Sequence, residues 1–179
     1  MGAHALDELN GRPLRTKISD RVLVALAAVS IAGACAIGLV GALTFRAWLV
    51  LLIPVGLFLV LAYNLEFARG RFHSDLWFGL AWGGFPVLNG YAAVAGDVGG
   101  VAVVAAVFAV VLSLAQRVLS THVRYVRRRV IAVRGELELA EGRREPLDAR
   151  RLTAPAEAGL RLLSLATVVL AATLAAFRM

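Results

Sequence analysis

Residues 22–43 read VLVALAAVSIAGACAIGLVGAL, and no charged side chain interrupts this stretch. As an α-helix it would be about 33 Å long, which is enough to cross a hydrocarbon core of roughly 30 Å. A helix in the core of a soluble protein would keep a polar face, and this stretch has none. It therefore predicts a membrane-spanning helix.

Four further apolar segments are about as long as a spanning helix needs to be. They cover residues 47–65, 76–96, 98–116 and 158–177, and the last depends on Arg161 reaching back to the membrane interface. Of the 179 residues, 60% are hydrophobic and 17% are charged, whereas a soluble domain carries about 25% charged residues. We therefore expect residues 1–179 to form a single all-α, polytopic transmembrane bundle of about five spanning helices.

Positive charges are divided unevenly between the segments outside these spans. Seventeen of the 19 lysine and arginine side chains fall on the side of the membrane that holds the N-terminus, and two fall on the other side. Lysine and arginine are enriched in cytoplasmic loops. We therefore expect a multi-pass integral protein of the plasma (cell) membrane with a cytoplasmic N-terminus, a cytoplasmic lead over residues 1–21 and a basic cytoplasmic connection over residues 117–157.

The formal net charge of +7 follows from this topology, so it does not require a nucleic-acid partner. Its densest part, residues 124–129, reads RYVRRR and directly follows the fourth predicted span. Anchoring to anionic membrane lipid is one interpretation. Binding of a polyphosphate head group is the other, because arginine pairs bidentately with phosphate oxygens. The sequence does not separate these two interpretations.

The third apolar run carries an internal break. Pro86 removes a backbone donor near the middle of the span, so we expect a kink there, with Asn89 beside it. An asparagine inside a membrane either bonds to a neighbouring helix or lines a cavity that admits a ligand. Gly79 and Gly83 form a Gly-x-x-x-Gly pair, which allows two helix backbones to approach closely.

Residues 63–75 read YNLEFARGRFHSD and form the chemically richest connection, on the predicted cytoplasmic face. The stretch is either a solvated turn held by arginine–acid pairs or a functional site, since polar groups at the end of an apolar helix are costly to bury without partners. No zinc, Walker or Cys-x-x-Cys motif competes with it. The candidate site residues in this stretch are Tyr63, Asn64, Arg69, Arg71, His73 and Asp75.

Residues 7–19 read DELNGRPLRTKIS and directly precede the first predicted span. This segment resembles the end of the first aspartate-rich motif of the UbiA-type membrane prenyltransferases, where an Asn-Asp-x-x-Asp-x-x-x-Asp run leads through Arg-Pro-[Leu/Ile] into a helix. Asp7 matches the last aspartate, while Arg12-Pro13-Leu14 and Ile18-Ser19 match the tail. The five predicted spans would then be similar to helices three to seven of the family.

The resemblance implies transfer of a prenyl group from a prenyl diphosphate to an acceptor, with Mg²⁺ held by two aspartate-rich motifs. It implies Asp7 as a metal ligand and Asn10 and Arg12 as substrate-binding residues, with the candidates of residues 63–75 assisting. The sequence departs from the family pattern in two places. The chain begins inside the first motif, so we expect an N-terminally truncated and divergent member. Where the second motif belongs, residues 120–125 read STHVRY and contain no aspartate.

Two functions stay open, and the sequence does not decide whether the chain is an enzyme. The first is a UbiA-like integral membrane prenyltransferase homologue, incomplete or inactive as it stands, acting on a prenyl diphosphate with Mg²⁺. The second is a non-catalytic membrane protein that binds an isoprenoid lipid, or a partner, through its cytoplasmic basic face. We predict that residues 1–179 alone do not carry out Mg²⁺-dependent prenyl transfer.

Overall fold

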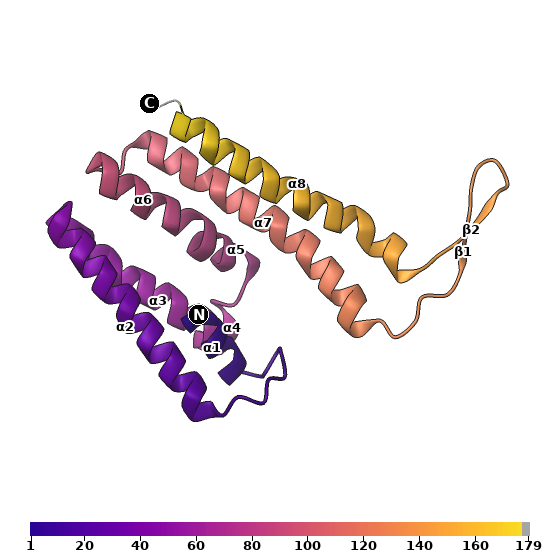
Figure 1. Cartoon of the computed structure of the whole chain (residues 1–179), viewed down its shortest axis with the longest axis horizontal. Helices are drawn as coiled ribbons and strands as arrows, with labels where there is room; N and C mark the ends of the chain where they lie inside the picture. The colour runs from indigo at the N-terminus through magenta and orange to yellow at the C-terminus, as the bar shows by residue number, and fades with distance from the viewer. Residues whose placement is uncertain (177–179) are drawn as a thin grey trace. The chain divides into compact units, whose positions relative to one another are not determined.

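The computed structural model describes residues 1–176 and divides into two compact units, Met1–Leu114 and Ala115–Met179. The first unit holds α1 (Gly2–Leu9), α2 (Asp20–Thr44), the 3₁₀ helix η1 (Ala47–Leu51), α3 (Leu52–Asn64), α4 (Phe67–Gly70), α5 (Asp75–Phe78), the π-helix η2 (Gly79–Gly84), α6 (Phe85–Ala95) and the first half of α7 (Gly100–Arg129) (Figure 1). The second unit holds the rest of α7, the strands β1 (Glu136–Glu138) and β2 (Arg144–Pro146), and α8 (Ala149–Ala176).

Four helical segments are long and apolar enough to cross a membrane, namely α2, η1 with α3, α7 and α8. At most 22% of the most apolar part of any of them is buried inside the protein, so their apolar side chains face outward. Such a surface is unfavourable in water and suits lipid. The predicted all-α membrane bundle is confirmed. The run 76–96 is helical from Asp75 to Ala95 as α5, η2 and α6, and its crossing of the membrane stays a prediction.

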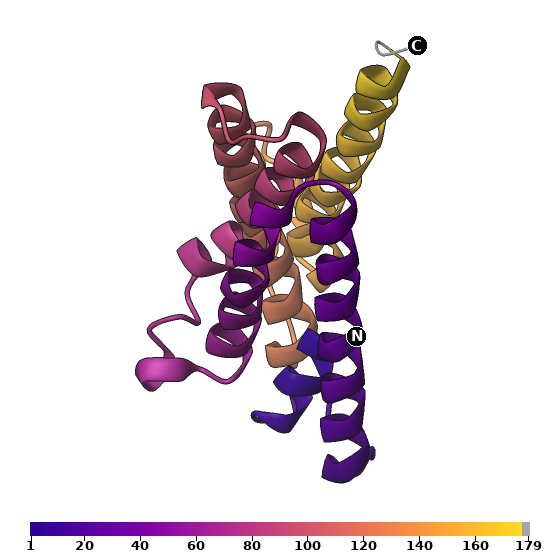
Figure 2. The ribbon, with the colours of Figure 1, turned by 90° about the vertical axis from the view of Figure 1, so that its left-hand side faces the viewer.

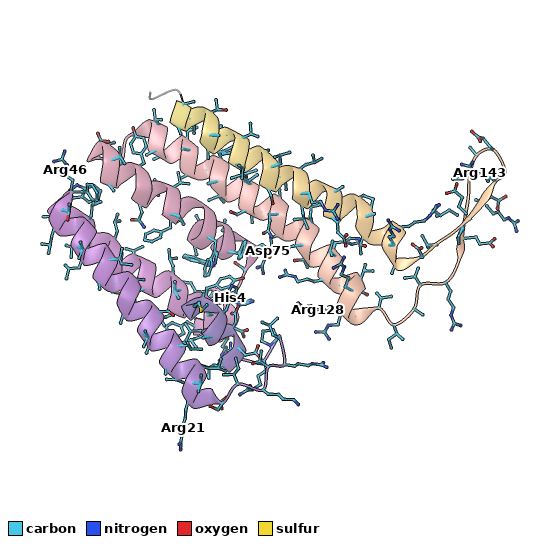
Figure 3. All side chains as sticks on the ribbon, viewed as in Figure 1. His4, Arg21, Arg46, Asp75, Arg128 and Arg143 are labelled. Atoms are coloured by element: carbon cyan, nitrogen blue, oxygen red, sulfur yellow. The ribbon has the colours of Figure 1, made fainter. Side chains whose placement is uncertain are left out.

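The last two helices extend beyond their apolar runs. α7 continues to Arg129 and α8 begins at Ala149, so the predicted basic connection over residues 117–157 is helical at both ends, and its position outside the membrane stays a prediction. Arginine is a good helix former, and Arg127–Arg129 complement the negative C-terminal end of the α7 dipole. The connection contains the antiparallel hairpin β1–β2, in which Leu137 pairs with Glu145. Figure 3 shows Arg128 at the end of α7 and Arg143 in the hairpin.

The N-terminal lead contains a helix that packs back onto the first unit. Ala5 and Leu6 of α1 are buried against Leu23 and Ala27 of α2, and α1 also contacts α3 (Figure 2). The two helices approach closely at Gly2, where an added Cβ atom would lie 3.1 Å from Ser30 Cβ. Residues 2–9 are thus an integral part of the first unit.

The segment from Asp75 to Ala95 packs against α7 through its glycines. At Gly83 an added Cβ atom would lie 2.5 Å from the carbonyl oxygen of Ala109, so the backbones touch there. Pro86 is the second residue of α6, which follows the π-helix, and it lacks the N–H that would complete the α-helical ladder. The π-helical turn just before it is a second irregularity of this segment, and the kink expected at Pro86 stays a prediction.

Candidate functional site

The end of α1 meets the end of α3 through two asparagines. The Asn10 Nδ2 group donates to the Asn64 carbonyl oxygen at 3.2 Å, and the Asn64 Nδ2 group donates to the Val60 carbonyl oxygen at 2.6 Å. Asn64 is 2% exposed, so its amide is a buried polar group whose donor is satisfied within α3. The first of these bonds joins two segments that are 54 residues apart in the sequence.

Tyr63 lies within a group of aromatic rings. Its ring stacks on His73 with centroids 4.5 Å apart, and the Trp82 ring lies 5.0 Å away. The His73 Nδ1–H donates to the Tyr63 carbonyl oxygen at 3.1 Å, which leaves Nε2 free to accept a hydrogen bond in the neutral ring. Phe78 completes the group at 6.1 Å from Tyr63. Together these contacts fix the connection after α3 against the start of the third run.

Asp7 faces this group from α1. Burial raises the pKa of the Asp7 carboxyl, while the nearby His73 and His4 lower it and Glu66 raises it, so that the net effect is a raised pKa. Figure 3 shows His4 on α1. The structure therefore brings together five of the residues that the sequence singled out, which we call the polar cluster: Asp7, Asn10, Tyr63, Asn64 and His73.

The three arginines predicted as site residues do not contribute a contact to the polar cluster. The Arg12 guanidinium pairs with Asp20 and donates to the carbonyl oxygens of Thr16 and Ile18, both at 3.0 Å. Arg69 and Arg71 are exposed and form no ion pair within residues 1–176. The remaining candidate, Asp75, is exposed at the first position of α5, which Ser74 caps.

Two acidic residues near the site were not among the sequence candidates. Glu8 is 2% exposed and accepts hydrogen bonds from the backbone N–H groups of Leu14 and Thr16 at 3.0 and 2.7 Å, and from the Thr16 hydroxyl at 2.9 Å. Glu66 acts electrostatically on Asp7. No local pattern announces either role, because each depends on how the chain folds back. For Glu8, the one sequence signal for this role is that an acidic residue stands shortly before a turn that offers several backbone N–H groups.

The connection after α3 is conformationally strained. Glu66, Ala68 and Arg69 have left-handed backbone angles, with φ of 53°, 54° and 61°. Each such residue costs roughly 1–2 kcal/mol relative to a right-handed conformation. Gly70, with φ of 80°, adopts the same region without this cost. Strain of this kind collects at functional sites, where the surrounding structure holds it in place.

The described residues do not fit a Mg²⁺ site of the kind that the resemblance implied. Mg²⁺ takes octahedral oxygen ligands, usually from carboxylates and substrate phosphates. Within residues 1–176 there is no group of three or more histidine, cysteine, aspartate or glutamate side chains that could hold a metal ion. Residues 120–125 lie within the regular helix α7, where the His122 Nε2–H donates to the Leu152 carbonyl oxygen at 2.9 Å.

An apolar cavity of about 480 Å³ lies between α2, α3 and α6 in the first unit. It falls within the range of roughly 300–1,000 Å³ that small-molecule sites occupy. No charged residue lines it, and Asn89 and Cys35 are its only lining residues with a polar or weakly polar side-chain group. Ile31 and Val60 line one end of the cavity and also pack against the cluster that Ala5 and Leu6 of α1 form with α2. α1 therefore packs beside two residues of the cavity wall without lining the cavity itself.

Comparison with known proteins gives one match. A family model described as the UbiA prenyltransferase family matches residues 5–136. The matched region includes the polar cluster, the helices around the cavity and all of α7, and it ends before α8. No curated protein and no solved structure matches the chain.

Proposed function

Because the chain belongs to the UbiA prenyltransferase family, we propose that it holds the prenyl chain of an isoprenoid in the apolar cavity between α2, α3 and α6. The observation that carries this proposal is the cavity itself, which is apolar and has a volume of about 480 Å³. Burial of a hydrocarbon chain in such a site is favourable by roughly 0.8 kcal/mol for each methylene removed from water. The protein acts within a membrane, which we take to be the cell membrane.

We propose further that residues 1–179 do not by themselves ionise a prenyl diphosphate with Mg²⁺. Prenyltransferases of this family generally hold Mg²⁺ with aspartate-rich motifs. Here no set of three ligands surrounds Asp7 within the described residues. The polar cluster then contributes hydrogen bonds and a stacked Tyr63–His73 pair rather than a metal centre.

The second candidate function is transfer of a prenyl group from a prenyl diphosphate to an acceptor. The family match favours it, as does the position of Asp7 beside His73, since such a pair can hold or accept a proton. The two candidates differ in whether turnover requires Mg²⁺ and in whether a product forms. Both require the cavity.

Extraction of lipid from the purified protein tests the first candidate. The wild-type chain is expected to retain an isoprenoid that mass spectrometry detects, and the Gly41→Leu variant is expected to lose it, because Gly41 lines the cavity. Gly33→Leu is the matched control: Gly33 lies in the same helix outside the cavity lining, and an added Cβ atom meets nothing within 4 Å at either glycine. Equal retention by both variants would contradict the proposal.

An activity assay separates the two candidates. Purified protein is incubated with geranylgeranyl diphosphate and an aromatic acceptor, with and without Mg²⁺, and prenylated product is measured. We expect none above the background of a protein-free sample. Mg²⁺-dependent product that disappears in the Asp7→Asn variant would instead establish prenyl transfer.

A further inference from the structure

Asn89 places one amide in the wall of an otherwise apolar cavity. It lies in α6, is half-buried, and lines the cavity together with side chains of α2 and α3. Its side chain forms no hydrogen bond within residues 1–176. An amide without a partner is costly inside a membrane, where no bulk water is available to satisfy it. The cavity therefore holds an unsatisfied neutral donor and acceptor that a bound molecule can use.

The charge of the cavity restricts what that molecule is. An asparagine amide offers two donors and an acceptor without charge. No lysine, arginine or histidine lines the cavity. A diphosphate is a multiply charged anion that needs cations or a metal to leave water. A hydroxyl or carbonyl group needs only a hydrogen bond, which the Asn89 amide provides.

The surroundings of the cavity favour entry from the lipid rather than from the cytoplasmic side. Ile37 and Phe45 line the cavity and are 75% and 59% exposed, so its wall is open on the apolar surface. None of its lining residues belongs to α1 or to the polar cluster. Arg12, the arginine nearest in sequence to α1, is held by Asp20. A neutral lipid dissolved in the bilayer reaches such an opening directly, whereas a diphosphate head group stays at the membrane surface.

We infer that the cavity takes an isoprenoid with an uncharged head group, a prenyl alcohol or a prenylated carbonyl compound, which hydrogen-bonds to the Asn89 amide. This inference rests on the proposed function, because the isoprenoid chain occupies the same cavity. It names the class of ligand that this cavity selects.

The test compares two ligands that share one prenyl chain. The protein is reconstituted in nanodiscs, and its dissociation constants for geranylgeraniol and for geranylgeranyl diphosphate with Mg²⁺ are measured by displacement of tritiated geranylgeraniol. We expect the alcohol to bind at least tenfold more tightly. We expect Asn89→Leu to weaken binding of the alcohol about tenfold, which is the effect of one hydrogen bond in a dry site. Binding of the saturated hydrocarbon phytane is expected to be unchanged by Asn89→Leu, which also shows that the variant is folded.

Each other outcome overturns a specific part of the inference. Tighter binding of the diphosphate would refute the selection for a neutral head group and would leave isoprenoid binding intact. Equal binding of the alcohol by wild type and Asn89→Leu would show that the Asn89 amide does not hydrogen-bond to the ligand. If no prenyl compound binds saturably to the wild-type protein, the proposed function itself fails.

Discussion

At the scale of single residues, Asp7 and Glu8 are neighbours in α1 whose carboxyl groups respond to folding in opposite directions. For Asp7, burial raises the pKa and the nearby histidines only partly offset it. For Glu8, burial also raises the pKa, but hydrogen bonds from Leu14 and Thr16 outweigh it and the net pKa is lowered. One helical turn thus carries one carboxylate that the fold stabilises and one that it destabilises.

This contrast predicts opposite effects of two conservative substitutions. The lowered pKa of Glu8 adds stability that is present above its ordinary pKa and is lost as the pH falls through the folded value. The raised pKa of Asp7 adds stability only at low pH, and this is lost as the pH rises through the folded value. We expect Glu8→Gln to lower, and Asp7→Asn to raise, the melting temperature at pH 7. Thermal unfolding in detergent at pH 7 and pH 4 measures both effects.

The pH series is also the control. Both differences in melting temperature from wild type are expected to shrink at pH 4, because Asp7 approaches its neutral form and Glu8 becomes protonated in the unfolded chain below its ordinary pKa. Shifts of the same sign for the two variants at pH 7 would show that a general effect on α1 dominates over the charges.

At the scale of elements, the contact between η2 and α7 depends on the absence of a side chain at Gly83. An added Cβ atom would lie 2.6 Å from Ser113 Oγ as well as 2.5 Å from the Ala109 carbonyl oxygen. Because a backbone oxygen cannot move aside by rotation, the helices must separate. We expect Gly83→Ala to destabilise the protein by about 1–3 kcal/mol, which corresponds to a fall in melting temperature of several degrees.

Gly90→Ala is the matched control for this prediction. Gly90 lies in the following helix α6, and an added Cβ atom there meets nothing within 4 Å. This variant is expected to be neutral or slightly stabilising, because alanine favours a helix over glycine. A loss of stability by Gly90→Ala equal to that of Gly83→Ala would show that the effect comes from helix propensity and not from the contact.

The elements divide into those that the sequence predicts and those that depend on tertiary contacts. The apolar runs predicted α2 and α3 closely, because lipid imposes one requirement on every position of a span. The helix α1 was not predicted, because Ala5 and Leu6 are too few apolar residues to give a periodic signal. The left-handed turn was not predicted either, since Ala68 and Arg69 are ordinary helix formers.

The candidate site follows the same division. The sequence singled out Tyr63, Asn64 and His73, and the structure brings them together with Asp7 and Asn10. It singled out Arg12 from a resemblance to a motif, but the local turn occupies its guanidinium. Composition marks where polar groups are concentrated, whereas their pairing depends on backbone geometry that composition does not encode.

At the scale of the whole molecule, the charge distribution predicts the orientation in the membrane. Seventeen lysine and arginine side chains lie on the side expected to be cytoplasmic, and two lie on the other. In a Cys35→Ser background, we expect a cysteine at Asp97 to react with a membrane-impermeant maleimide in intact cells. We expect a cysteine at Arg143 to react only after the membrane is opened.

Both positions suit this measurement because both are exposed and outside the predicted spans. The same pair also tests whether α7 crosses the membrane, since an odd number of crossings must separate the two cysteines. Labelling of both positions in intact cells would contradict a crossing between residues 97 and 143. Labelling of Arg143→Cys alone in intact cells would show that the orientation is opposite to the predicted one.

The π-helix η2 has a consequence for how this chain tolerates changes of length. A π-helical turn holds one residue more than an α-helical turn in the same place. Removing one residue from Gly79–Gly84 would restore regular winding and leave Asn89 directed toward the cavity. Removing one residue from a regular helix such as α2 would instead rotate everything beyond it by about 100°. Within Gly79–Gly84, therefore, one residue can be lost without rotating the side chains beyond it, and we expect ligand binding to survive such a deletion.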